Sequence, residues 1–356
     1  MGLGDAFAGM LSHPLAKHQA QKLRSAREQA LASDPELPQK EYQRARQSLL
    51  GQTFGDTPAG EACVPCVASA KARRRAQRMD IVNGGLNACP EHAAEATRLR
   101  QDMDQVEYAR LAKHVYVKND PNAPDDLKRS PAGFLEATPE EVAALGIDPK
   151  DLEPRGSDFR AAVYKKDPAV WGEGAKPAYQ LAFRGSTLAE EDWQNNFAQN
   201  ANRESSYYQR AVDLGNGIAQ RSQADNVQMI GHSLGGGLAS AAQGGSGSPA
   251  TTFNSAGLHP DTVARYSKLP ERMQADAAKI LAIQVEGEVL TATQETGLSS
   301  LFANPAVGQR SVVPAASASV SANDRHAMDE VIDAIEKRKT EDEATLTACV
   351  ASKSRS

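Results

Sequence analysis

The stretch MIGHSLGGGLAS, residues Met229–Ser240, decides the fold. Within it, residues 231–235 read GHSLG and fit the pattern G-x-S-x-G, in which a serine lies at a sharp turn between a strand and a helix. Apolar residues precede the turn, and very small residues follow it, so that a helix can pack closely against the strand it leaves. The stretch therefore predicts a strand–turn–helix unit with Ser233 at the turn.

Strands and helices alternate around this unit. Apolar patterns predict strands at 159–164, 178–183, 226–232, 250–257 and 279–285, the first two as a hairpin pair. Helical periodicity or composition predicts helices at 104–116, 207–220, 234–243, 261–278 and 327–339. Such alternation is typical of a mostly parallel sheet with helices on both faces. We therefore expect an α/β-hydrolase fold, a mostly parallel sheet flanked by helices, with a helical N-terminal extension.

Composition and charge narrow the functional classes. Hydrophobic residues make up 40% of the chain and charged residues 24%, as in an ordinary globular protein. The formal net charge of -5 argues against general binding of nucleic acid, which needs a positive excess. No apolar run approaches the roughly 18 residues that span a bilayer. Asp5 precedes every basic residue, the wrong order for a secretory signal peptide. We expect secretion without a cleaved signal peptide, or else a cytoplasmic protein.

The chain divides into three parts by composition. Residues 1–100 are polar and rich in helix formers, and we expect a helical region that serves as a lid, a delivery element or a partner-binding surface. Residues 101–340 hold the alternating strands and helices of the hydrolase. Residues 341–356 form a polar tail, and we expect the chain to fray after Arg338.

Four cysteines are too few for a disulfide scaffold in a chain of 356 residues. Cys63, Cys66, Cys89 and His92 form two short pairs that could close a tetrahedral zinc site. The 22 residues between the pairs exceed the usual spacing of zinc fingers, which favours free thiols or a disulfide over zinc. A Cys63–Cys66 or a Cys66–Cys89 disulfide stays open at this point.

Ser233 needs a histidine base, because a serine hydroxyl is a weak nucleophile at neutral pH. In this fold the order along the chain is serine, acid, histidine. Apart from His232, which adjoins the serine, only His259 and His326 follow Ser233. An acid-bearing strand end lies between Ser233 and His326 but not between Ser233 and His259, and His326 immediately precedes an amphipathic helix near the C-terminus. We therefore prefer His326 as the base.

The acid is expected after a strand that lies between the serine and the histidine. The strand at 279–285 is followed by Glu286 and Glu288. Glu288 lies where the chain turns off the sheet, whereas Glu286 is strand-terminal, so Glu288 is preferred. Asp261 and Asp324 are less favoured alternatives.

An oxyanion hole needs two donors. One is the backbone N–H after the nucleophile, that of Leu234. The second is expected from AFRGS, residues 182–186, where Ser186 follows a turn at the end of a strand. Asp192 and Trp193 are candidates to anchor this loop, although a place in the core suits Trp193 equally well. Such chemistry requires no metal or cofactor.

Six segments occur in the order seen in class 3-type lipases and their bacterial relatives. They lie between residues 104 and 339 and read YQLAFRGS, DWQNNF, GHSLGGGLAS, TFNSAGL, VEGEVLT and RHAMDEVI. The chain resembles this branch of the α/β-hydrolases. The resemblance implies a catalytic triad of Ser233, Glu288 and His326. It also implies an oxyanion hole formed by Ser186 and Leu234. The usual acid of the family is aspartate, so the glutamate here is a departure.

Antibacterial phospholipase effectors of contact-dependent (type VI) secretion resemble this chain in their helical extension. The resemblance implies phospholipase A-type hydrolysis of glycerophospholipid membranes, with a secretion-system component and a neutralising immunity protein as partners. From the net charge and from the serine chemistry we expect no nucleic acid, metal or cofactor. Two alternatives stay open: a water-soluble carboxylesterase or thioesterase, and a non-enzymatic toxin or binding protein that acts through the N-terminal helices.

Overall fold

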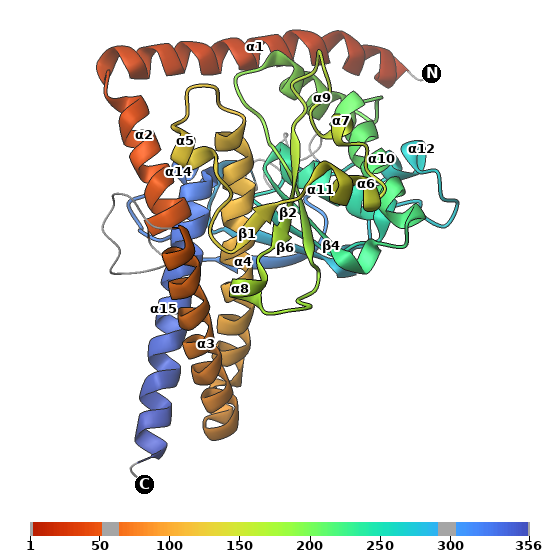
Figure 1. Ribbon diagram of the computed structural model, residues 1–356. Helices are drawn as coiled ribbons and strands as arrows, with labels where there is room; N and C mark the ends of the chain where they lie inside the picture. The colour runs from red at the N-terminus through yellow and green to blue at the C-terminus, as the bar shows by residue number, and fades with distance from the viewer. Residues whose placement is uncertain (1–2, 52–63, 291–303, 355–356) are drawn as a thin grey trace.

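The structure, a computed structural model, describes residues 3–51, 64–290 and 304–354 (Figure 1). Its strands form one seven-stranded sheet in the order β1-β2-β3-β4-β5-β6-β7. Strands β1 and β2 form antiparallel pairs, and β3 to β7 run parallel. The strands are Phe134–Glu136 (β1), Ala161–Lys166 (β2), Tyr179–Phe183 (β3), Val227–His232 (β4), Ala250–Phe253 (β5), Ile280–Val285 (β6) and Gln309–Val313 (β7). The mostly parallel α/β sheet expected from the sequence is confirmed.

Helices flank the sheet and extend beyond it. Before β3 they are Leu3–Ser33 (α1), Leu37–Arg46 (α2), Val64–Ala88 (α3), Ala93–Lys118 (α4), Asp125–Lys128 (α5), Pro139–Ala144 (α6), Pro149–Leu152 (α7) and Pro168–Trp171 (α8). After β3 they are Glu190–Asn200 (α9), Ser206–Gln220 (α10), Leu234–Ser246 (α11), Asp261–Tyr266 (α12), Ala322–His326 (α14) and Met328–Lys353 (α15).

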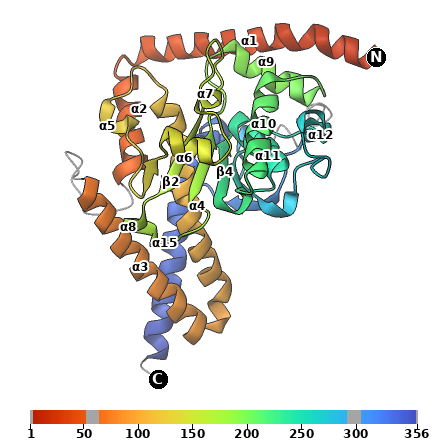
Figure 2. The same cartoon turned by 45° about the vertical axis from the view of Figure 1, so that its right-hand side comes forward.

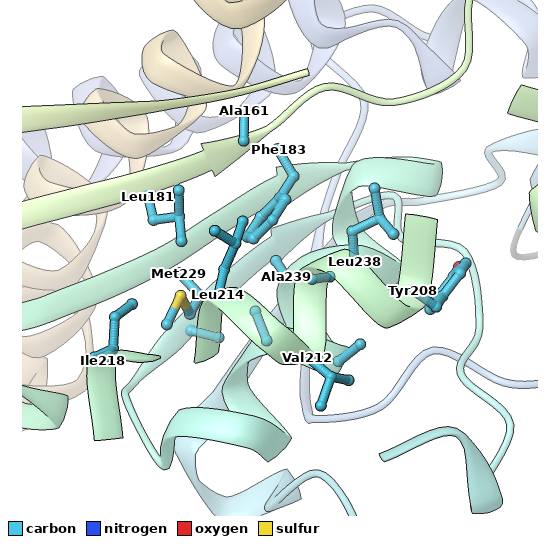
Figure 3. Close-up of a cluster of buried hydrophobic side chains, with 14 of the residues drawn as sticks. Ala161, Leu181, Phe183, Tyr208, Val212, Leu214, Ile218, Met229, Leu238 and Ala239 are labelled. Carbon is cyan, nitrogen blue, oxygen red and sulfur yellow. The ribbon is translucent and has the colours of Figure 1, made fainter. Parts of the chain in front are cut away.

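The central strands are buried on both faces. On one face, Leu181 of β3 and Met229 of β4 pack against α10 and α11, as Figure 3 shows. On the other face, their neighbours Ala182 and Ile230 belong to a second cluster with α4 and α15. Two buried faces explain why these strands read as nearly continuous apolar runs. Strand β4 is the middle strand, so the turn at its end lies at the centre of the sheet edge.

Helix α3, the first half of α4 and the second half of α15 project from the sheet as a bundle, here called the stalk (Figures 1 and 2). Leu346 of α15 is buried there against Val82 and Leu99, and Arg98 donates two hydrogen bonds to Asp342. The expectation that the chain frays after Arg338 is therefore wrong. Helix α15 continues to Lys353, and Asp342 and Glu343 in its second half form ion pairs with arginines of α4 and α3.

A disulfide joins Cys89 to Cys349 in the stalk. This pairing removes Cys89 from a zinc site with His92, and it contradicts a Cys66–Cys89 disulfide. Spacing carries no signal for the observed bond, because its cysteines are 260 residues apart. Cys63 and the side chain of Cys66 lie outside the described residues.

Helix α1 lies across one end of the molecule and packs on α9 (Figure 1). Ala16 and Ala20 are buried on its inner side, and Arg24 Nε donates to the carbonyl of Leu188 in the loop after β3. In the described part of the chain, every helix is too short or too polar for a bilayer span.

Candidate active site

Ser233 lies at the turn between β4 and α11. Its backbone has φ 57° and ψ -128°, a conformation that side-chain-bearing residues adopt only when the surroundings enforce it. The Ser233 N–H donates to the Phe253 carbonyl at 3.1 Å, and its carbonyl accepts from the Ala256 N–H at 2.9 Å. A side chain at Gly231 would overlap the Gly235 carbonyl, so the strand and the helix meet this closely only with glycine.

His326, at the end of α14, connects Ser233 to Glu288. Its Nε2 lies 3.1 Å from the Ser233 Oγ, and its Nδ1 lies 2.7 Å from the Glu288 Oε2. Hydroxyl, imidazole and carboxylate thus form one continuous line of hydrogen bonds. Such a line can activate a serine for attack on an ester carbonyl.

The Glu288 carboxylate is fully buried in the turn after β6. Its backbone N–H donates to the Val285 carbonyl at 3.2 Å, and its Oε2 accepts from the Leu290 N–H at 2.9 Å. A buried carboxylate is stable only when it is paired and hydrogen-bonded. Because the carboxylate accepts, His326 carries its hydrogen on Nδ1 and presents the Nε2 lone pair to the serine.

The alternatives to these residues lie elsewhere. Glu286 is exposed, and Asp324 accepts from the Ser321 hydroxyl at the start of α14. His259 lies beside the exposed Asp261, 3.9 Å from its carboxylate. The structure therefore brings His326 and Glu288, rather than their rivals, to Ser233.

The residues expected in the oxyanion hole lie on the two sides of the turn. Leu234 is the first residue of α11, where backbone N–H groups lack a carbonyl partner within the helix. Ser186 lies in the half-buried loop after β3. Asp192 anchors that loop, because its carboxylate accepts from the Thr187 N–H at 2.6 Å and from the Tyr207 hydroxyl at 3.0 Å. The role of Ser186 and Leu234 as donors stays a prediction.

Three further residues, not assigned from the sequence, hold the segment that carries His326. His232 Nε2 donates to the His326 carbonyl at 2.8 Å, and its Nδ1 lies 3.1 Å from the Tyr116 hydroxyl. Asn254 Nδ2 donates to the carbonyls of Arg325 at 2.9 Å and of His326 at 3.2 Å. The sequence offers only weak signals for these three residues, because two of them are polar residues at strand ends and the third is a tyrosine on a helix.

Burial sets the protonation of the groups around the triad. It lowers the pKa of His232 to about 3, and the neighbouring His326 acts in the same direction. It also raises the pKa of Tyr116 above its ordinary value. Both side chains are therefore neutral over the usual range of pH.

Comparison with known proteins identifies the family of the chain. Residues 107–337 match the family described as Phospholipase-like: Tle-like phospholipase domain. An extracellular phospholipase A1 from Serratia liquefaciens is 33% identical over 224 residues, which are 61% of this chain and 64% of that protein. The chain thus spans just under two thirds of the length of this relative. The family match includes the turn at Ser233 and both of its partners, and the chain belongs to the family of Tle-like phospholipase domains.

Proposed function

We propose that this chain is a serine-dependent phospholipase of the A type that hydrolyses glycerophospholipids. The observation that carries the proposal is the position of His326, which contacts both the Ser233 hydroxyl and the buried Glu288 carboxylate. The family match and the phospholipase A1 relative support phospholipid as the substrate class.

The mechanism follows from the direction of the hydrogen bonds. Ser233 Oγ attacks the ester carbonyl while His326 Nε2 takes its proton. Glu288 keeps the other nitrogen protonated and stabilises the imidazolium that forms. His326 then returns the proton to the leaving alcohol oxygen, which releases the lysophospholipid. Water repeats the cycle on the acyl-enzyme and releases the fatty acid.

The N–H groups of Leu234 and Ser186 hold the oxyanion in this proposal. The N-terminus of α11 adds a favourable dipole at the same place. Each donor aimed at an oxyanion contributes about 3 kcal/mol to the transition state. The support is the position of Leu234 at the start of the helix and the anchoring of the Ser186 loop by Asp192.

The proposal extends to the biological setting. The relative is named a phospholipase A1 and extracellular, which supports cleavage of the sn-1 ester and action outside the producing cell. We propose an antibacterial effector, delivered by contact-dependent (type VI) secretion and neutralised in the producer by an immunity protein. Its support is the resemblance of the chain, with its helical N-terminal extension, to such effectors.

The test is hydrolysis of phospholipid vesicles, with the lysolipid products identified by mass spectrometry. Wild type should release lysolipid that retains its sn-2 chain, and Ser233→Ala should release none. Ser352→Ala, at the exposed end of α15, is the matched control and should match wild type. A preference for short soluble esters over vesicles would favour the carboxylesterase alternative. Full toxicity of Ser233→Ala in target cells would favour the non-enzymatic one.

A further inference from the structure

The peptide groups next to the His326 side chain are tied to three strands. The His326 carbonyl accepts from His232, the last residue of β4, and from Asn254, which follows β5. Asn254 also donates to the Arg325 carbonyl, and its Oδ1 accepts from the N–H of Val285 at the end of β6 at 2.9 Å. The backbone around His326 is therefore fixed independently of the Glu288 contact.

The hydrogen bonds of His232 define its tautomer. A carbonyl oxygen can only accept, so His232 Nε2 must carry the hydrogen that points to His326. Its Nδ1 then holds a lone pair, to which the Tyr116 hydroxyl donates. If Nδ1 carried the hydrogen instead, two lone pairs would face each other at the His326 carbonyl.

The charges of the His232 and Tyr116 side chains, here called the pair, do not change in the working range of pH. Burial lowers the pKa of His232 to about 3, and His326 and Glu288 are the titratable groups that act on it. Burial also keeps the Tyr116 hydroxyl protonated. The pair can therefore hold a position, but it cannot serve as an acid or a base.

Packing fixes the pair in place. A side chain at Gly185, next to Ser186, would overlap the Tyr116 hydroxyl and approach the His232 carbonyl to 2.5 Å. The loop after β3 thus closes over the pair. The rings of His232 and His326 have centroids 4.9 Å apart and planes inclined by 43°, so His232 forms a wall beside the His326 ring.

We propose that Tyr116 and His232 are positioning residues that hold His326 over Ser233 through a chain of hydrogen bonds, from the Tyr116 hydroxyl to His232 and from His232 to the His326 carbonyl. The inference rests on the proposed function and explains how the base is oriented for it. Neither residue belongs to the proposed triad or oxyanion hole. Displacement of a reacting group by about 1 Å can cost about 100-fold in rate, which sets the scale of the effect.

The test compares kcat and KM on phospholipid vesicles for variants of both residues. His232→Leu removes the donor and should lower kcat about 10- to 100-fold with KM within about twofold of wild type. Tyr116→Phe should lower kcat about 10-fold, because it removes the donor that fixes the tautomer. His232→Gln offers an amide N–H near the place of Nε2 and should recover most of the loss. The shape of the pH profile of kcat/KM should not change in any variant.

A second buried histidine–tyrosine pair provides the control. His114 Nδ1 lies 2.8 Å from the Tyr164 hydroxyl, between α4 and β2, and both side chains are fully buried. Tyr164→Phe removes the same kind of hydrogen bond as Tyr116→Phe and should leave kcat at the wild-type value. Thermal melting of each variant gives the folded fraction, to which kcat is normalised.

Three results would overturn the inference. They are a wild-type kcat in Tyr116→Phe and His232→Leu, an equal loss of kcat in Tyr164→Phe, and a failure of His232→Gln to exceed His232→Leu. If His232→Leu does not fold, the two tyrosine variants decide. Ser233→Ala separates this inference from the proposed function: wild-type hydrolysis by Ser233→Ala would refute the function itself.

Discussion

Glu288→Gln tests the electrostatic part of the proposed mechanism. Glutamine keeps the shape of the side chain and can still accept from His326 Nδ1, but it carries no charge. The carboxylate lies 2.7 Å from Nδ1 and is fully buried. With an effective dielectric constant of about 20, unit charges centred about 4 Å apart attract by about 4 kcal/mol. Loss of this attraction to the imidazolium predicts a fall in kcat of about 10³-fold.

The assay is the initial rate of fatty-acid release from phospholipid vesicles at saturating substrate. Glu286→Gln is the matched control, because Glu286 lies two residues before Glu288 and is exposed. The substitution removes the same charge. It should keep the wild-type kcat. Glu288→Asp retains the charge but shortens the side chain by one methylene, and it should fall between wild type and Glu288→Gln.

Two results would refute this reasoning. A kcat of Glu288→Gln within tenfold of wild type would show that the buried charge does not stabilise the transition state. A comparable loss in Glu286→Gln would show that the effect comes from the overall charge of the turn rather than from the contact with His326. Melting curves exclude unfolding as the cause.

The remaining predictions concern stability. Gly231→Ala forces a side chain onto the Gly235 carbonyl and should cost about 3 kcal/mol of unfolding free energy. Gly84→Ala in α3 places the new methyl at an ordinary contact distance of 3.6 Å from Val350 and should add about 1 kcal/mol. Urea unfolding measures both. Cys349→Ser removes the stalk disulfide and should cost about 2–5 kcal/mol in the same assay with kcat unchanged. Burial lowers the pKa of His114 from 6.5 to about 4, so the unfolded chain binds the proton first and stability falls as the pH drops below 6.5. His114→Gln should reduce the stability lost between pH 7 and pH 5 by about 2 kcal/mol. Equal effects of the two glycine changes, a loss of kcat in Cys349→Ser, or an unchanged pH dependence in His114→Gln would contradict these expectations.

The centre of the fold was predictable because its strands are buried on both faces. Strands β2 to β6 give apolar patterns that stand out from their polar surroundings. Edge strands give none: β7 buries only Val313 fully, and β1 has three residues. The helix expected at 261–278 ends at Tyr266. Ser267 already has an extended backbone with φ -65° and ψ 136°. The helix could not continue through Leu269 in any case, because a proline disfavours the helical conformation of the residue before it.

The triad candidates were predictable because chain order and the turn at Ser233 restrict the choice to very few residues. The structure brings those residues together, and their catalytic role is a proposal. Tyr116 could not be found in the same way. It lies on the helix expected at 104–116 and carries no motif, and its partner lies 116 residues further along the chain. Asn254 gives no periodic signal either, because its contacts depend on where β5 ends relative to β6.

The N-terminal extension contributes to a cluster of buried ion pairs around Arg110 of α4. Arg110 of α4 is fully buried and donates to Glu107 at 3.0 Å, to Glu336 of α15 at 2.6 Å and to the Ser48 carbonyl at 3.0 Å. Lys71 of α3 donates to Glu107. A buried charge that loses its partner costs about 3–5 kcal/mol. The family match covers residues 107–337, yet two members of this cluster, Ser48 and Lys71, lie outside it.

Helix α4 connects this cluster to the candidate active site. Tyr116 follows Arg110 by six residues, about 9 Å along the helix axis, and its hydroxyl contacts His232. The boundary expected at residue 100 falls inside the same helix. The buried ion pairs of Glu107 and Arg110 lie in the middle of this helix, between the stalk and Tyr116. The turn of α4 that carries Glu107 and Arg110 is thus packed against residues of the extension, and about two turns further on the same helix presents Tyr116 to His232.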